Sequence, residues 1–175
     1  MLRVINTIAV MAITLSVVGC KMINEELPTY EATSIVECYD QAPDFTTTLL
    51  SGQSITLSEL RGEIVLLIFF SHTCPDCKAL LDDIKASTAE FEELGVRILA
   101  IAREGTVHEI EEYVATNSYC FDTALDNHRA LYHLYATLYV PRRYLIDTEG
   151  YVAATTIEYP RDHVPTLLSQ IETLK

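Results

Sequence analysis

The chain has 175 residues, of which 49% are hydrophobic and 21% charged, and its formal net charge is −13. This length suits a single domain, and the apolar fraction excludes a largely disordered chain. The 12 basic residues against 25 acidic ones argue against nucleic-acid binding, which needs a basic face. The five cysteines are an odd number, so at least one of them cannot pair within the chain.

The first twenty residues have the features of an export signal. Arg3 precedes an apolar run over residues 8–18, which is too short for a good membrane-spanning helix because that needs about 20 apolar residues. The run ends at Gly19-Cys20, and this ending resembles the lipobox of bacterial lipoproteins. The resemblance implies cleavage before Cys20 and lipid attachment to its sulfur. An ordinary cleaved signal with a chance cysteine is the alternative.

These features divide the chain into three parts. They are a signal peptide over residues 1–19, a polar tether over 20–36, and one domain over 37–175. Export and lipidation would place the domain in the cell envelope, anchored to a membrane and facing the periplasm or the outside. Disulfide bonds are possible in such an oxidising compartment.

The rest of the chain alternates strands and helices. In chain order the patterns predict a strand at 44–50 and its return at 54–57, a helical turn at 59–62, a strand at 63–70, a helix at 75–93, a strand at 96–102, a helix at 107–116 capped by Thr106 with Glu109, a strand at 120–124, a helix at 126–138, a hairpin of strands at 143–147 and 151–156, and a last helix from Asp162 to Leu174. Because a hairpin follows the alternating units, this order predicts an α/β fold with a mixed sheet.

The chemical centre is the motif Cys74-Pro75-Asp76-Cys77, between the strand at 63–70 and the next helix. A helix N-terminus stabilises a thiolate through its unpaired amides and its partial positive charge. We expect Cys74 to be the exposed nucleophile and Cys77, one turn further on, to attack a mixed disulfide. Pro75 costs no hydrogen bond in the first helical turn and stiffens the loop.

A zinc site or an inert disulfide is the alternative for a CxxC motif. Zinc needs about two further ligands, usually from a second CxxC or a histidine pair. The other cysteines of the domain, Cys38 and Cys120, stand alone, and no histidine pair has that spacing. The sequence therefore favours redox chemistry without a metal.

Several segments together resemble the TlpA/ResA-like thiol–disulfide oxidoreductases of the thioredoxin superfamily. They are Gln41–Thr46, Leu57–Gly62 followed by the apolar strand and CxxC, Val140-Pro141, and Tyr144–Asp147 with Gly150. In the family's order, these segments cover residues 38–175. The resemblance implies a thioredoxin-like fold, a central mixed sheet flanked by helices, with an added N-terminal β-hairpin.

The same resemblance implies a function and a site. The enzyme would exchange disulfides with protein clients, for example in cytochrome maturation, and would depend on an upstream membrane reductant. The redox-active group would be the Cys74–Cys77 disulfide, and no cofactor would be needed. Pro141 would be cis and would pack beside Cys74, and the backbone of Val140 would pair with the bound client.

The sequence departs from the family at two positions near the motif. Thr73 stands where the family usually has Trp, and Leu80 stands where several relatives carry a Glu that helps the second cysteine gain or lose its proton. The group that serves Cys77 is therefore open. The negative charge of Asp76 opposes a thiolate nearby and favours a reducing protein.

For five other residues two interpretations stay open. His72 either lowers the pKa of the first cysteine or is a rim histidine without a role. Arg142 and Arg143 either counteract the acidic residue of the motif or form a solvated strand end. Cys38 and Cys120 either form a structural disulfide or are two buried free thiols, the simpler interpretation.

Two rival functions use the same fold. An SCO-like copper chaperone has three residues between its cysteines and a distal histidine, whereas this chain has two residues between them and no obvious matching histidine. A thiol peroxidase has Pro and Thr ahead of its reactive cysteine, whereas Leu67 and Ser71 stand at those positions. The sequence disfavours both rivals.

Overall fold

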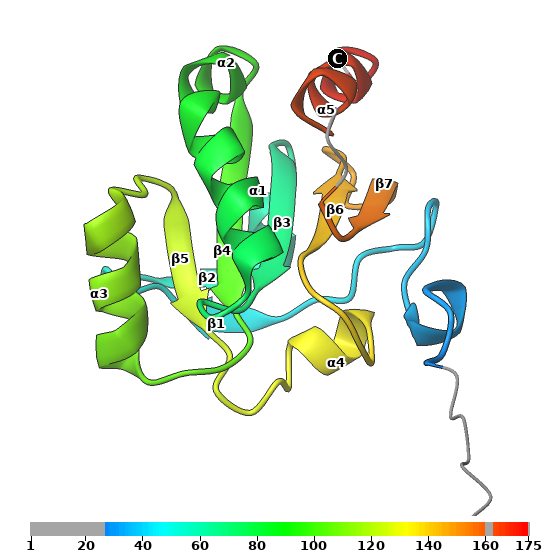
Figure 1. The fold of residues 1–175 in the computed structure, drawn as a ribbon. Coiled ribbons are helices and arrows are strands. Elements are labelled where there is room, and N and C mark those ends of the chain that lie inside the picture. The colour runs from blue at the N-terminus through cyan, green and yellow to red at the C-terminus, as the bar shows by residue number, and fades with distance from the viewer. Residues whose placement is uncertain (1–26, 160–162, 175) are drawn as a thin grey trace, which may run out of the picture.

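The computed structural model describes residues 27–159 and 163–174, and Figure 1 shows their arrangement. The elements are η1 (Glu31–Thr33), β1 (Thr46–Thr48), β2 (Ser54–Thr56), η2 (Leu57–Leu60), β3 (Ile64–Phe70), α1 (Pro75–Ala86), α2 (Thr88–Glu93), β4 (Val96–Ala102), α3 (Val107–Asn117), β5 (Asp122–Leu125), α4 (Tyr132–Tyr135), β6 (Arg142–Ile146), β7 (Val152–Ile157) and α5 (His163–Glu172). The predicted signal, Cys20 and the Asp162 cap lie outside the described residues. Within the described ranges, no helix is long and apolar enough to cross a membrane.

Five strands form one sheet in the order β5-β4-β3-β6-β7, and β1 pairs with β2 in a separate hairpin. β3 is parallel to β4, and β4 to β5, whereas β6 is antiparallel to β3 and β7 to β6. This arrangement confirms the predicted α/β fold with a mixed sheet and an N-terminal hairpin. The fold is thioredoxin-like. The parallel strands end at the lower edge of the sheet in Figure 1, where α1 and α3 begin.

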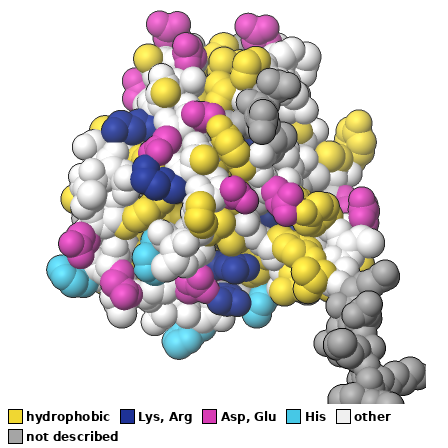
Figure 2. Space-filling model, viewed as in Figure 1, with side chains coloured by type: hydrophobic (Ala, Val, Ile, Leu, Met, Phe, Trp, Pro, Cys, Tyr) yellow, Lys and Arg dark blue, Asp and Glu magenta, His cyan; other side chains and the backbone are white. Residues whose placement is uncertain are grey.

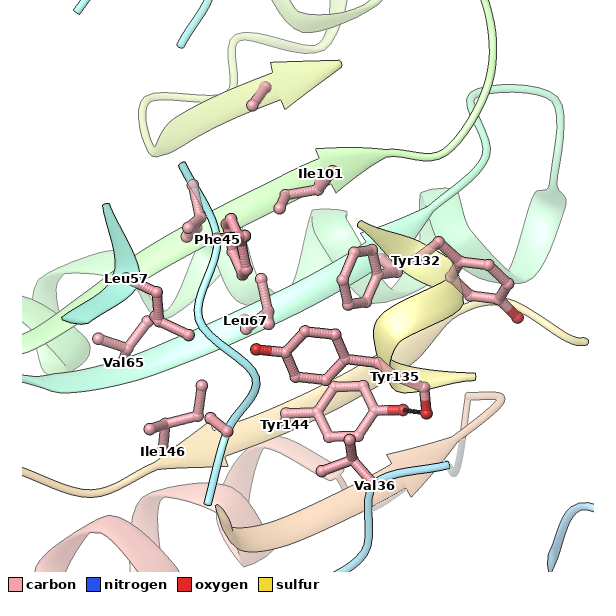
Figure 3. Close-up of a cluster of buried hydrophobic side chains, with 14 of the residues drawn as sticks. Val36, Phe45, Leu57, Val65, Leu67, Ile101, Tyr132, Tyr135, Tyr144 and Ile146 are labelled. Carbon is pink, nitrogen blue, oxygen red and sulfur yellow. Dashed lines mark hydrogen bonds between the residues drawn. The ribbon is translucent and has the colours of Figure 1, made fainter. Parts of the chain in front are cut away.

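Both faces of the sheet are covered. α1, α2, α3 and α5 pack on one face, and the β1–β2 hairpin, η2 and α4 cover the other. All seven residues of β3 are buried because this strand lies between the two layers. On the second face, Phe69 packs against the rings of Tyr132, Tyr135 and Tyr144. Figure 3 shows these three tyrosines within the buried cluster on this face.

The helix predicted at 75–93 is interrupted. α1 ends at Ala86, and α2 begins at Thr88 after Ser87, whose backbone leaves the helical region at φ −108° and ψ 14°. The Thr88 hydroxyl donates to the carbonyls of Ile84 (3.2 Å) and Lys85 (3.0 Å). Such local bonds compete with the helical ladder, and hydrophobic spacing does not reveal them.

The helix predicted at 126–138 was wrong for most of its length. The only helical residues there are those of α4, and β5 begins two residues later than predicted. Arg129 has φ +56°, and the Asp126 carboxylate accepts from the amide of Tyr132 at 2.8 Å. Asp126 therefore caps the short α4 across a turn.

The packed part of the chain begins before the predicted boundary at residue 37. Thr33 and Val36, within the predicted tether, are buried. The amides of Ile35 and Val36 donate to the carbonyl of Tyr135, so this segment is fixed against α4. Residues 33–36 therefore lie against the domain.

Candidate active site

The CxxC motif lies where the sequence places it, between β3 and α1. Cys74 is the N-cap of α1, and its Sγ accepts a hydrogen bond from the amide of Cys77 at 3.4 Å. Pro75 occupies the first turn. Both cysteines are free thiols in this structure, with Cys74 half-buried and Cys77 fully buried. One sulfur is therefore open to a client and the other is shielded behind it.

The Val140–Pro141 peptide bond is cis, as the family resemblance implies. The Sγ of Cys74 donates to the carbonyl of Val140 at 3.8 Å, so this loop lies directly against the exposed thiol. The Tyr132 hydroxyl donates to the carbonyl of Tyr139 at 2.6 Å and fixes the loop from α4. Residues that are 66 positions apart in the sequence thus meet at one sulfur.

The surroundings of Cys77 favour the neutral thiol. Burial raises the pKa of Cys77 well above its ordinary value. Two features act in the opposite direction: the amide of Ser71 donates to its Sγ at 3.4 Å, and the positive charge of Arg103 favours a thiolate. The Arg103 guanidinium lies over the ring of Tyr132, 5.2 Å from its centroid, and its Nε has no hydrogen-bond partner within residues 27–159 and 163–174. The usual acidic position holds Leu80, which is fully buried.

The other predicted supporting residues take different positions. Asp76 is exposed, and His72 is half-buried with its ring 6.2 Å from that of Tyr113. In the part of the chain that the structure describes, the Nδ1 of His72 has no hydrogen-bond partner. Asp76 thus faces solvent at the helix entrance, whereas His72 is partly enclosed beside α3.

The interpretation of Arg142 and Arg143 as a solvated strand end was wrong. Both are buried, because β6 carries them between two layers. The Arg142 guanidinium donates to Thr33 Oγ1 (2.6 Å), Ser34 Oγ (2.9 Å) and the carbonyl of Leu138 (2.9 Å). Arg142 therefore joins the N-terminal segment to the cis-proline loop.

Among the described residues, Arg143 has no such set of partners. Its buried Nε and Nη1 have no hydrogen-bond partner there, and burial lowers the pKa of its guanidinium to about 10. Register places Arg143 opposite Ile68 of β3.

Sequence reasoning missed a chain of polar groups behind Cys77. Besides its amide contact with that sulfur, the buried Ser71 donates its hydroxyl to Glu104 Oε1 at 2.7 Å. Glu104 is in turn paired with Arg129, and Thr73 also contacts the Ser71 hydroxyl at 3.0 Å. The signal available in the sequence was the position of Glu104 two residues after β4, because CxxC follows β3 at the same edge of the sheet.

We expect Glu104→Ala to destabilise the protein by about 1 kcal/mol at pH 7, since Ser71 and Arg129 lose their acceptor. The hydrogen bond from Ser71, and to a smaller extent the one from Arg129, holds the pKa of Glu104 below its ordinary value. Its stabilising effect is therefore complete above the unfolded pKa of about 4.3 and is lost as the pH falls through the folded value.

Urea unfolding at pH 7 and at stepwise lower pH measures this effect. The exposed Glu111→Ala on α3 is the control. A loss for Glu104→Ala that does not shrink in acid would contradict the assignment.

Cys38 and Cys120 are free and exposed. The structure therefore supports neither the disulfide between them nor their burial. In the described part of the chain, no group of three or more His, Cys, Asp or Glu side chains is arranged to hold a metal ion.

Comparisons with known proteins agree with this geometry. The chain matches the AhpC/TSA family over residues 38–155. It is 27% identical over 132 residues to the thiol-disulfide oxidoreductase ResA of Bacillus cereus, covering 75% of this chain and 76% of that one. A protein of the same name from Oceanobacillus iheyensis is 30% identical over 115 residues, covering 63% of this chain and 60% of the other.

A solved structure from Bacteroides thetaiotaomicron, of a protein proposed to be a protein disulfide isomerase, superimposes with a TM-score of 0.75. It is 27% identical in sequence, and the match covers 81% of this chain and 92% of that one. The chain therefore belongs to the AhpC/TSA family and is a thiol–disulfide oxidoreductase of the thioredoxin superfamily.

Proposed function

We propose that this enzyme reduces disulfides of protein clients through Cys74 and Cys77. The thiolate of Cys74 attacks a client disulfide, forms a mixed disulfide and releases one client thiolate. Cys77 then gives up its proton and attacks Cys74, which forms the Cys74–Cys77 disulfide and releases the second client thiol. Two electrons and the proton of Cys77 pass to the client, and the client thiolate released first takes up its proton from solvent. The observation that carries the proposal is the half-buried Cys74 at a helix N-terminus with the buried Cys77 behind it.

The surroundings of the motif support a reducing direction. A dithiol is a strong oxidant when its reduced form is stabilised as a thiolate. Here Cys77 is kept as a thiol by burial, and the sequence places the negatively charged Asp76 between the two cysteines of the motif. We expect a reduction potential near that of thioredoxin, about −270 mV.

The N-terminal sequence supports a location at the membrane. Lipid attached to Cys20 would hold the enzyme at a membrane surface, with its domain facing the periplasm or the outside. A membrane reductant would then restore the dithiol, and clients would include cysteine-containing proteins of that compartment, such as those of cytochrome maturation. Pro141 would shape the surface beside Cys74. The backbone of Val140 would pair with the backbone of the bound client.

Insulin reduction by the domain tests this function. Wild-type protein supplied with dithiothreitol should catalyse the reaction, and Cys74→Ala should lower the rate by about 10³-fold or more, to the uncatalysed level, because the attacking thiolate is lost. Cys120→Ser removes an exposed thiol outside the motif and should keep full activity. Activity that survives Cys74→Ala would exclude the proposed chemistry.

A further inference from the structure

A cavity of about 580 Å³ lies between the N-terminal residues 30–39 and Thr155–Ile157 of β7. β7 is the last strand of the sheet. The N-terminal segment pairs with its beginning, since the amide of Tyr39 donates to the carbonyl of Val152 and the amide of Val152 to that of Asp40. Beyond Val152 no described strand pairs with the outer edge of β7. The cavity is thus a groove along an open strand edge, here named the β7 groove.

One end of the β7 groove lies beside the strand that follows the cis-proline. Ile157, which lines it, pairs with Arg142, the residue after the cis-proline. The amide of Glu158 donates to the carbonyl of Pro141 at 2.9 Å. Since neighbouring strands lie about 4.8 Å apart, a polypeptide bound at Cys74 can reach the groove within a few residues.

The groove combines aromatic side chains with negative charge. Tyr39 is 87% exposed and Tyr30 is 39% exposed, although both are large hydrophobic residues. Two exposed carboxylates, Glu31 and Glu37, also line it, and none of its described lining residues is a lysine or arginine. In Figure 2, hydrophobic side chains flanked by acidic ones occupy the side of the molecule that carries β7 and the N-terminal segment. An open strand edge with aromatic walls suits an added strand, and the carboxylates favour a basic one.

We propose that the β7 groove binds an extended, basic segment of the client polypeptide, next to the cysteine that undergoes exchange. The inference rests on the proposed function, because the segment belongs to the client of Cys74. Main-chain hydrogen bonds from the edge of β7 supply affinity that is independent of sequence. The tyrosines contact alternate side chains, and Glu31 and Glu37 attract lysine or arginine between them.

Binding can be measured without any thiol chemistry. The probe is a fluorescent peptide in which lysine alternates with valine or threonine and serine replaces the cysteine; the matched peptide carries glutamate for lysine. We expect the basic peptide to bind the Cys74→Ser protein at least about tenfold more tightly than the glutamate peptide does. High salt should reduce this difference in affinity. Glu31→Gln with Glu37→Gln should remove most of this preference. Glu90→Gln with Glu93→Gln on the exposed surface of α2 should not.

Kinetics separate this inference from the proposed function. The same peptides, now with a disulfide, should differ about tenfold in kcat/KM on wild-type enzyme, whereas a small aromatic disulfide should react equally well with all these variants. Equal binding of the basic peptide to the Glu31/Glu37 variant would overturn the groove proposal alone. No turnover of the small disulfide would overturn the proposed function. A dimer that forms at the β7 edge and is not displaced by the peptide would assign the groove to a second copy.

Discussion

Replacing Cys77 by alanine should turn the enzyme from a turnover catalyst into a trap for its clients. Cys74 keeps its position as N-cap and its contact with Val140, so the first attack remains possible. The mixed disulfide then lacks its internal resolving thiol. Its lifetime should increase to the minutes-to-hours range of uncatalysed disulfide rearrangement. Multiple turnover of insulin should fall about 10²-fold or more, with a stoichiometric adduct left behind.

Non-reducing electrophoresis and mass spectrometry measure the adduct. The double variant Cys74→Ala with Cys77→Ala is the control and should form none. If Cys77→Ala releases its client as fast as the wild type does, Cys77 is not the resolving thiol.

The pH dependence of the same step follows from the burial of Cys77. Because its pKa is raised, the reactive thiolate is a small fraction at neutral pH, and that fraction grows about tenfold for each pH unit. The rate of resolution in the wild type should therefore rise about tenfold per unit from pH 7 to pH 9. A rate that levels off below pH 8 would show that another group takes up the proton of Cys77.

The sequence predicted the elements whose evidence is local. β3 and β4 are runs of apolar residues, and their observed bounds differ from the predicted ones by at most one residue. The capping box of Thr106 and Glu109 was predicted because both partners lie within one helical turn. The CxxC geometry follows from the same logic, since a strand, a proline and a helix N-terminus are adjacent in the chain.

The side-chain contacts that the sequence did not reveal depend on distant partners. The residues next to Arg142 in the sequence do not indicate that it is buried, so a surface position was expected. Its guanidinium nevertheless donates a hydrogen bond to Thr33, 109 positions away. The Ser71–Glu104 contact likewise joins the ends of two strands that only the sheet brings together. The pairing of Cys38 and Cys120 could not be decided either, because it depends on where two loops lie. Hydrophobic periodicity carries no information about such contacts.

Phe69→Ala should cost about 3–5 kcal/mol of unfolding free energy, the usual loss when a fully buried phenylalanine is truncated. Phe69 is completely buried, and its ring lies 5.5 Å from that of Tyr132, 5.3 Å from Tyr135 and 6.2 Å from Tyr144. These three tyrosines come from α4 and β6 and belong to the cluster in Figure 3, so the Phe69 side chain joins the central strand to both elements. The cavity left by alanine cannot close without moving an aromatic ring whose hydroxyl is hydrogen-bonded.

Urea unfolding of the reduced proteins measures this loss. Phe69→Leu keeps most of the apolar volume and should lose less than half as much. The two variants also test whether the core supports the site. The Tyr132 hydroxyl holds the carbonyl of Tyr139 beside the cis-proline loop, and the ring of Tyr132 rests on Phe69. Folded Phe69→Ala at low temperature should therefore show a raised KM for protein clients, while its rate with a small disulfide stays close to that of the wild type. An unfolding loss below about 1 kcal/mol would mean that α4 repacks over the cavity.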